Sequence, residues 1–366
     1  MTPKADVAIV GAGMAGASLA AELAPHASVL LIEAEDQPGY HSTGRSAAFW
    51  SESYGGPLVQ PLTTASGVHL REGGYLNPRG ALHIAGESGG AALDALERMF
   101  AGAAVPLQRI GADELRRRIK GLRDGWAEAL WEPSCADIDV ARLHADYLAT
   151  ARRGGARLLT AAAVEQAERS GSAWRISTRA GEVEAAVLVD AAGGWADAVA
   201  AACGVAPVGI RPYRRTIAQL RIAPPVPADL PLVIDAAGRF YFKPEAGGRL
   251  WLSPHDETPC EPCDCAAEEI DVARAIDRLQ RVVDWRVERV EKSWAGLRSF
   301  APDRLPVYGF DPEAEGFFWF AGQGGFGIQT APAAAKLAAA LLLGRAPDPL
   351  VAGIDHIPYS PGRLLN

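Results

Sequence analysis

Near the N-terminus, residues 7–16 read VAIVGAGMAG and residues 29–33 read VLLIE, and these two stretches decide the fold of the chain. Each begins with an apolar run typical of a strand buried on both faces of a parallel sheet. Gly11, Gly13 and Gly16 have the G-x-G-x-x-G spacing. The first glycine permits a tight turn, the second lets a pyrophosphate approach the backbone, and the third lets a helix pack on the strand. We therefore predict a strand–helix–strand unit that binds a dinucleotide.

The helix between these strands is expected to run from Met14 to Leu23, and its N-terminal N–H groups favour a phosphate. Glu33 follows Gly11 by 22 residues, where a carboxylate accepts hydrogen bonds from a ribose 2′-OH and repels a 2′-phosphate. Glycine is common in this chain, with 39 among 366 residues, so the glycine motif alone is weak evidence. The order strand, glycines, helix, strand and Glu33 makes a plain turn the weaker interpretation.

Composition places the chain among globular proteins. Its 366 residues suit one large domain or two intertwined domains, with 49% hydrophobic and 22% charged residues. The net charge of −8 argues against nucleic acid as a partner. The longest apolar segment, residues 333–343, contains Lys336 and is too short to span a bilayer. With no signal peptide before the glycine motif, we expect a cytoplasmic protein without an integral membrane segment.

Five cysteines, an odd number, do not suggest a disulfide framework. Cys260, Cys263 and Cys265 form a C-x-x-C-x-C cluster in a proline-rich acidic loop. A metal clip or a redox pair is one interpretation, but structural zinc usually takes four ligands, and the nearest further candidate is His255. We therefore predict no metal and a solvated loop.

Three distant segments repeat one theme, an apolar strand followed by a glycine-rich turn. They are residues 7–16, 187–195 and 317–327, and a helix is expected over 328–343 after the last. Such repetition predicts one parallel sheet assembled from separate parts of the chain. A hairpin is expected from residues 174–178 and 182–185, and Asp139 is placed to cap a helix from Val140 to Arg153.

The intervening segments have a different character. Residues 213–222, 231–243 and 248–253 are predicted to be amphipathic strands, and a helix over 268–283 is expected to bury Ile270, Ala273, Ile276, Leu279 and Val283. We predict an α/β protein in which a discontinuous Rossmann-like domain carries an inserted α+β domain built on an antiparallel sheet. The expected boundaries are residues 1–80, 138–206 and 296–366 for the first domain, and 81–137 and 207–295 for the second.

Several further stretches carry a resemblance to a known family. They are residues 39–48 (GYHSTGRSAA), 191–193 (AAG), 240–244 (FYFKP), 294–300 (WAGLRSF) and 323–330 (QGGFGIQT). Together with the glycine motif, they resemble the superfamily of FAD-dependent D-amino acid oxidases and glycine oxidases. Within that superfamily the chain is most similar to bacterial D-arginine dehydrogenase and related D-amino acid dehydrogenases. The resemblance covers nearly the whole chain.

The resemblance implies bound FAD, with its ADP half on the first glycine motif and with Arg45 and Ser46 near the edge of the flavin ring. Some members attach the flavin to a cysteine near Arg298. Residues 299–309 contain no cysteine, so non-covalent FAD is expected. The implied cofactor residues are Gly11, Gly13, Met14, Gly16, Glu33, Ala34, Thr43, Gly44, Arg45, Ser46, Ala47, Val164, Ala192, Gly193, Trp195, Arg298, Gly324, Gly325, Phe326, Gly327, Ile328 and Gln329.

For the substrate, the resemblance implies that Arg215 and Arg298 bind a carboxylate, a role that suits the planar and permanently charged guanidinium. Tyr54 and Tyr241 would supply hydroxyls, and the carbonyl of Gly325 would accept from the amine. Arg214 is an alternative to its neighbour Arg215, because adjacent residues of a strand face opposite ways.

Two pocket positions depart from the pattern of relatives that prefer cationic D-amino acids. Those relatives carry an acidic residue where this chain has Ala81, and a histidine where it has Phe49. An alanine cannot neutralise a buried guanidinium or ammonium. We therefore expect D-Arg and D-Lys to be poor substrates and an apolar or aromatic side chain to be preferred.

The expected reaction is oxidative deamination of a D-amino acid to a 2-oxo acid and ammonia, with hydride transfer from Cα to flavin N5. The electron acceptor could be oxygen or a quinone-like compound. Oxidation of a secondary amine such as sarcosine, of glycine, or of a 2-hydroxy acid would need the same carboxylate site and stays an alternative. A flavin-binding subunit of a larger complex is a further alternative.

Overall fold

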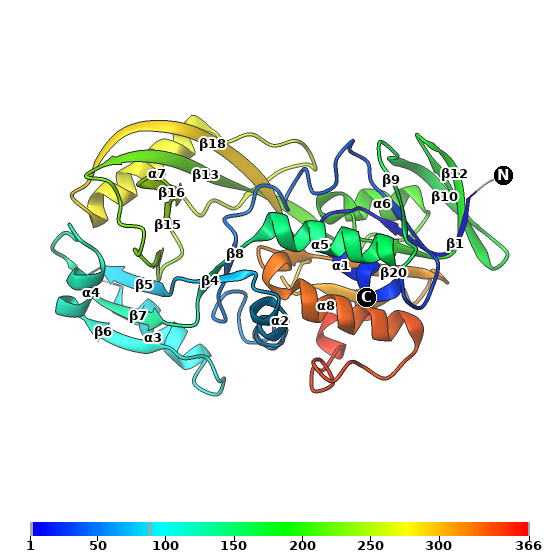
Figure 1. Ribbon diagram of the computed structural model, residues 1–366, viewed down its shortest axis with the longest axis horizontal. Coiled ribbons are helices and arrows are strands. Elements are labelled where there is room, and N and C mark those ends of the chain that lie inside the picture. The colour runs from blue at the N-terminus through cyan, green and yellow to red at the C-terminus, as the bar shows by residue number, and fades with distance from the viewer. Residues whose placement is uncertain (1–2, 87–88, 365–366) are drawn as a thin grey trace.

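The computed structural model describes residues 3–86 and 89–364, which form two large sheets at opposite ends of an elongated molecule (Figure 1). The first sheet has eight strands in the order β10-β11-β12-β1-β2-β9, with β20 beside β12 and β19 at its edge. Its strands are β1 (Lys4–Val10), β2 (Val29–Ile32), β9 (Arg157–Leu159), β10 (Val164–Ser170), β11 (Ala173–Thr178), β12 (Gly181–Asp190), β19 (Val307–Phe310) and β20 (Phe317–Ala321).

The centre of this sheet is parallel, as the three strand-and-glycine segments predict. β1 pairs in parallel with β2 and with β12, and β12 pairs in parallel with β20. One expectation needs correction. Residues 182–185 and 187–190 are parts of one strand, whose first half pairs with β11 and whose second half pairs with β20. The hairpin strand therefore continues into the buried central strand.

Helix α1 (Met14–Leu23) has the predicted bounds and packs between α5 (Val140–Arg153) and α8 (Gly327–Leu343). The cap predicted for α5 is confirmed, because the Asp139 carboxylate accepts from the Arg142 amide at 3.1 Å. Helix α2 (Gln60–Glu72) packs on α8. Within the described residues, no helix is both long and apolar enough to cross a membrane.

The second sheet has ten strands in the order β21-β18-β13-β16-β15-β14-β5-β7-β6, with β17 on β13. It is antiparallel, as predicted, except that β14 and β5 run parallel. Its strands are β5 (Ala81–Gly86), β6 (Gln108–Gly111), β7 (Trp126–Glu132), β13 (Arg211–Ala223), β14 (Leu232–Asp235), β15 (Tyr241–Glu245), β16 (Arg249–Ser253), β17 (Thr258–Pro259), β18 (Arg286–Phe300) and β21 (Gln323–Gly324).

Helix α7 (Glu269–Val282) covers this second sheet with only part of the predicted face: Leu279 and Val283 are buried and Ile276 packs half-buried against the same core. Ile270 is 53% exposed, whereas the residues that the helix buries are Asp271, Val272, Ala275, Leu279 and Val282. The sequence of α7 offers two apolar stripes that share Leu279. Arg214 on β13 reaches Asp271 at 2.8 Å, which fixes the rotation of the helix in favour of the stripe beside Asp271.

Candidate active site

A cavity of about 530 Å³ lies at the carboxyl ends of the parallel strands of the first sheet. This edge is where open α/β sheets bind ligands. Many of the cofactor residues implied by the sequence line it: Gly11, Gly13, Met14, Glu33, Ala34, Thr43, Ser46, Val164, Ala192, Gly193, Trp195, Arg298, Gly324, Gly325, Gly327 and Ile328. All three glycine-rich turns therefore meet at one cavity.

The first glycine turn shows why these positions carry no side chain. Gly11 has a φ of +99°, and a Cβ there would lie 2.5 Å from the carbonyl oxygen of Ala191. A Cβ on Gly16 would lie 1.8 Å from the carbonyl oxygen of Gly11, so α1 packs directly on the turn. Gly13 differs, because the nearest atom to its Cβ would be Thr43 Oγ1 at 3.3 Å. Because Gly13 has no side chain, its backbone leaves room for a ligand in the cavity.

Two helices begin at this cavity, α1 and α8. Neither has a cap from its own N-cap side chain or an acidic residue in its first turn, although the Met14 amide of α1 donates to Thr43 Oγ1 at 3.0 Å. Uncapped N–H groups and the positive end of a helix dipole suit an anionic group. At α1 that group would be a pyrophosphate, and at α8 the electron-rich edge of a reduced flavin.

Glu33 lies in the cavity wall at the end of β2 and is 9% exposed. Its carboxylate accepts from the amide of Ala12 at 2.9 Å and from the amide of Glu35 at 3.0 Å. These bonds fix the carboxylate while leaving lone pairs for ribose hydroxyls. Together, the uncapped helix ends, the glycine turns and Glu33 fit an adenine dinucleotide such as FAD.

Six of the implied cofactor residues do not line this cavity. Ala47 and Gln329 line a smaller pocket beside it. Arg45, expected near the flavin edge, instead pairs with Asp264 at 2.5 Å and donates to the carbonyl of Cys265 at 3.1 Å. The others have packing roles: Gly16 contacts the first turn, Gly44 donates to Gly39, and Phe326 lies against Phe300.

The cavity is also lined by residues outside the implied cofactor set, among them Tyr40, His41, Arg179, Leu297 and Gln323. His41 bonds Glu35 at 2.9 Å and its ring lies 4.5 Å from that of Trp195. Arg179 comes from the turn between β11 and β12, and nothing in its sequence context points to the cavity. A signal for His41 was available, since it lies inside the 39–48 segment.

The smaller pocket, about 20 Å³, shares four wall residues with the large cavity: Ser46, Arg298, Gly325 and Ile328. The two spaces are therefore adjacent. Its other lining residues are Ala47, Ala48, Phe49, Tyr54, Arg215, Tyr241, His255 and Gln329. The sequence-predicted substrate residues Tyr54, Tyr241, Arg215, Arg298, Gly325 and Phe49 all meet here, and none of the lining side chains is acidic.

Arg298 projects from β18 into this pocket and is 7% exposed. No carboxylate pairs with its guanidinium among residues 3–86 and 89–364, and its Nη1 donates to the carbonyl of Leu297 at 3.3 Å. Burial lowers the pKa of Arg298 below its ordinary value, and the nearby Arg215 adds to this effect. A buried cation without a counterion is a strong binding site for an anion.

Arg215 lies on β13 and is 2% exposed, but it already has partners. Its Nε donates to the carbonyl of Asp256 at 2.8 Å, and its Nη2 donates to Glu257 at 2.9 Å. Glu257 is also held by Arg304 at 2.8 Å. Arg214 points the other way, toward acidic residues of α7, so the alternative assignment of Arg214 to the pocket does not fit.

Tyr54 and Gly325 are in close contact. A Cβ on Gly325 would lie 1.9 Å from the Tyr54 hydroxyl, so only glycine fits beneath it. Tyr241 on β15 is 4% exposed, and burial raises its pKa despite the neighbouring Arg215 and Arg298. The ring of Phe49 lies 5.6 Å from that of Tyr54 and 5.9 Å from that of Tyr241, which makes one wall aromatic.

Ala81 does not line the pocket. It is fully buried behind it, in an apolar cluster that contains Tyr241 and Ala47, with Phe49 packed against it. His255 is the unforeseen pocket residue. Burial lowers the pKa of His255 to about 3, and its Nδ1 donates to the carbonyl of Gly238 at 2.8 Å, so the ring is neutral.

The cysteine cluster lies in the loop that Arg45 contacts. Cys263 is exposed, and Cys260 and Cys265 are half-buried thiols. Burial raises the pKa of Cys260 and of Cys265. Within the part of the chain that the structure describes, no group of three or more histidine, cysteine or acidic side chains is arranged to hold a metal ion.

Known proteins share both the sequence pattern and the fold. The DAO family, described as FAD dependent oxidoreductase, matches residues 6–341. Glycine oxidase of Pseudomonas aeruginosa is 28% identical over 275 residues, covering 71% of this chain and 69% of that protein. The crystal structure of glycine oxidase from Geobacillus kaustophilus superposes with a TM-score of 0.85 and 25% identity, covering 98% of each chain.

L-proline dehydrogenase from P. horikoshii superposes with a TM-score of 0.86, covering 100% of this chain and 99% of that one. At 20% identity, this likeness shows the fold alone. The expected α/β fold and the FAD requirement are thereby confirmed, while no finding distinguishes a D-arginine dehydrogenase-like subtype. With its glycine turns and two adjacent cavities, the chain belongs to the DAO family of FAD-dependent oxidoreductases.

Proposed function

We propose that this protein oxidises a neutral D-amino acid with an apolar side chain to a 2-oxo acid and ammonia. The observation that carries the proposal is Arg298, a buried cation with no carboxylate partner in the described chain, facing a pocket that adjoins the cofactor cavity. A substrate carboxylate would supply the missing counterion and form charge-assisted hydrogen bonds with the guanidinium. A bound carboxylate would place the neighbouring Cα toward the shared wall of the two cavities.

FAD, when bound, supplies a two-electron acceptor for the hydride that leaves the substrate Cα. The glycine turns and Glu33 would hold its ADP half, and the turn at Gly324–Gly325 would lie beside the ring. Absence of a cysteine from the cavity lining supports non-covalent binding. Acid precipitation should then release the yellow colour into solution, and retention of colour on the protein would contradict this expectation.

The chain's own residues orient the amino acid and prepare its amine. Arg298 would hold the carboxylate, the carbonyl of Gly325 would accept from the amine, and the hydroxyls of Tyr54 and Tyr241 would donate to the substrate. The charges of Arg215 and Arg298 and the buried walls favour the neutral amine by lowering the ammonium pKa. The substrate can therefore lose its proton to water without a dedicated side-chain base.

The proposed preference for a neutral side chain follows from the pocket wall. The resemblance implies that Phe49 stands where relatives that prefer cationic substrates carry a histidine, and Ala81 offers no charge behind it. A guanidinium or ammonium brought into such a pocket would be buried without a partner. We therefore expect D-Leu and D-Phe to have higher kcat/KM values than D-Arg and D-Lys.

Glycine or a small secondary amine such as sarcosine is the second candidate substrate, and the pocket volume of about 20 Å³ favours it. A space of this size holds little beyond one water, so a large side chain would require the aromatic wall to move. A 2-hydroxy acid would use the same carboxylate site. A subunit role would instead predict that none of these compounds reduces the flavin.

The deciding experiment is anaerobic mixing of the purified holoenzyme with D-amino acids, L-amino acids, glycine, sarcosine and 2-hydroxy acids, while the flavin absorbance is followed. Rapid bleaching by D-Leu or D-Phe, with slow or no bleaching by D-Arg, is the expected result. A preference for D-Arg, or bleaching only by glycine, sarcosine or a hydroxy acid, would overturn the proposal. Admission of air then distinguishes oxygen from a quinone-like acceptor.

A further inference from the structure

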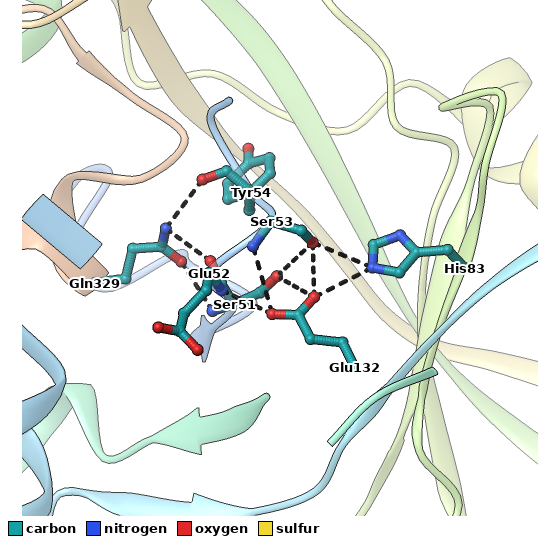
Figure 2. Close-up of polar contacts among 7 residues, drawn as sticks. All are labelled: Ser51, Glu52, Ser53, Tyr54, His83, Glu132 and Gln329. Carbon is teal, nitrogen blue, oxygen red and sulfur yellow. Dashed lines mark hydrogen bonds and ion pairs between the residues drawn. The ribbon is translucent and has the colours of Figure 1, made fainter. Parts of the chain in front are cut away.

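Outside the proposed substrate contacts lies a second buried charge, the carboxylate of Glu132 at the end of β7 (Figure 2). Its Oε1 accepts from the amides of Glu52 and Ser53 at 2.7 and 3.4 Å. Its Oε2 accepts from the hydroxyls of Ser51 and Ser53 at 3.0 and 2.6 Å. His83 completes the set at 3.2 Å, so both oxygens are occupied.

These contacts keep Glu132 ionised at complete burial. Burial alone raises the pKa of a carboxyl group, but hydrogen bonds from His83, Ser53 and Ser51 outweigh it and leave the pKa of Glu132 lowered. Removal of a carboxylate from water is costly, and an apolar side chain is often at least as stable in such a place. A contribution to the overall stability of the protein therefore does not explain why a carboxylate is buried at position 132.

The same short segment is held from its other side by Gln329 of α8 (Figure 2). The Gln329 side chain accepts from the Ser51 amide at 3.2 Å and donates to the carbonyls of Ser51 and Tyr54, each at 3.2 Å. Residues 51–54 are thus fixed between the second sheet, through Glu132, and the helix that begins at the large cavity, through Gln329.

The segment ends at Tyr54, the residue whose hydroxyl touches Gly325. A contact this close tolerates little displacement, because a shift of Tyr54 would move its hydroxyl away from the substrate or into the Gly325 backbone. A displacement of about 1 Å in a positioning group can lower a rate by roughly a hundredfold. The accuracy of the Tyr54 position therefore depends on what holds residues 51–53.

We propose that Glu132, together with His83, is a positioning residue that fixes residues 51–53 so that the Tyr54 hydroxyl meets the bound amino acid. The inference rests on the proposed function, because it assigns Tyr54 to the substrate. Glu132 lines neither the pocket nor the cofactor cavity, and its carboxylate bonds within residues 51–53 and to His83, so we expect it to act through this segment.

Glu132→Ala and Glu132→Gln test the proposal, with Glu128→Gln as the matched control on the same strand, where an exposed carboxylate pairs with Arg109. The first readout needs no substrate: amide hydrogen exchange of the holoenzyme. Amides of Glu52 and Ser53 should exchange at least about tenfold faster in Glu132→Ala. The Ser51 amide, which donates to Gln329, should change less, and the control should match the wild type.

The second readout is kcat and KM per bound flavin with the amino acid that bleaches the enzyme fastest. Glu132→Ala should lower kcat/KM by about ten- to a hundredfold, mainly through kcat, at unchanged flavin content. Glu132→Gln keeps an oxygen that can accept from the amides of Glu52 and Ser53, so its kcat/KM should fall less. In a Tyr54→Phe background, the further loss caused by Glu132→Ala should shrink to about twofold.

Each outcome is decisive. Unchanged exchange at residues 52 and 53 overturns the proposal, and so does an equal loss of activity with and without the Tyr54 hydroxyl. If Glu132→Ala does not fold, Ser53→Ala is measured instead. It should show the same faster exchange and the same loss of kcat/KM, each to a smaller extent, and unchanged values of both would contradict the proposal. If no amino or hydroxy acid reduces the wild-type flavin, the proposed function fails, but the exchange experiment still tests the role of Glu132.

Discussion

The cofactor cavity and the substrate pocket share a wall, yet they are built from different parts of the chain. The cavity is bounded by three glycine-rich turns, and in the first of them a Cβ on Gly11 or Gly16 would strike a main-chain oxygen. The pocket is made of side chains, with Arg298 and an aromatic wall brought together from separate strands and a loop. A backbone site depends on where glycines stand in the sequence, whereas a side-chain site depends on how distant elements pack.

The largest effect is expected at the backbone site. Gly16→Ala would place a Cβ 1.8 Å from the Gly11 carbonyl oxygen, with no flexible side chain to move aside. We expect a loss of stability on the order of 3 kcal/mol and little folded holoenzyme. Gly13→Ala meets only Thr43 Oγ1 at 3.3 Å and should fold, but with weakened FAD binding. Thermal unfolding measures the loss of stability, and the flavin-to-protein ratio measures the loss of FAD binding. Equal losses in both variants would contradict the different roles assigned to Gly16 and Gly13.

At the side-chain site, the largest effect is expected for Arg298→Met. The variant should lose about 3 kcal/mol of transition-state binding, roughly a hundredfold in kcat/KM, because the substrate carboxylate loses its partner. Without substrate, its melting temperature should stay the same or rise, since a buried unpaired charge is removed. Steady-state kinetics measures the expected fall in kcat/KM, and calorimetry measures the unchanged or higher melting temperature.

Arg214→Met is the matched control for that variant. Arg214 pairs with Glu268 and Asp271 at the start of α7 and, at 3.7 Å, with Asp256, so its loss removes an ion-pair partner from three carboxylates while both pocket arginines stay in place. Here the melting temperature should fall while kcat/KM stays close to the wild-type value. The same pattern in both arginine variants would contradict the assignment of Arg298 to the substrate.

The contrast between the two sites also explains what the sequence could predict. Residues 7–33 yielded the helix bounds, the parallel strands and the dinucleotide site, because turns and close contacts of the backbone demand glycine at fixed spacing. The substrate residues came from resemblance, and no spacing rule links Tyr54 to Gly325. The salt bridge between Arg215 and Glu257 could not be foreseen, since it depends on how the loop after β16 folds back.

The apolar periodicity did not identify the buried face of a helix where two faces are similarly apolar. In α7, the predicted face includes Ile270 and Ala273, which are exposed, whereas the helix buries Val272 and Val282, and the pattern alone does not choose between them. An ion pair with Arg214 decides it in the folded protein. In β12, the strand passes from a hairpin into the central sheet without a break, and the sequence could not show that the two pieces are continuous.

A smaller effect is expected at the aromatic wall. Phe49→Leu removes ring atoms that lie near Tyr54 and Tyr241 and enlarges a pocket of about 20 Å³. The ratio of kcat/KM for D-Phe to that for glycine should rise about tenfold, a typical effect of space in an apolar pocket. Phe310→Leu, a change at a 40% exposed ring on β19, should leave the ratio unchanged. A fall in the ratio would contradict the pocket assignment of Phe49.

The smallest effect expected at neutral pH is the one at His255, because this group changes the stability of the protein only in acid. The pKa of this ring is lowered to about 3 in the folded protein, mainly by burial. In the unfolded chain it is about 6.5. Between these values the unfolded chain binds a proton that the folded protein does not. Stability should therefore fall as the pH drops from about 6.5 toward 3, by at most about 1.4 kcal/mol per pH unit from this group.

His255→Asn should reduce that slope, because asparagine does not titrate and tolerates the positive φ of 56° at this position. Melting temperatures measured over the acid range give the slope for each variant. His69 and His144 also have lowered pKa values, so the difference between variants isolates the His255 contribution. His356→Asn, at an exposed site, should leave the slope unchanged. Parallel curves for wild type and His255→Asn would mean that the pocket wall admits a proton, and that this side-chain site is wetter than its packing indicates.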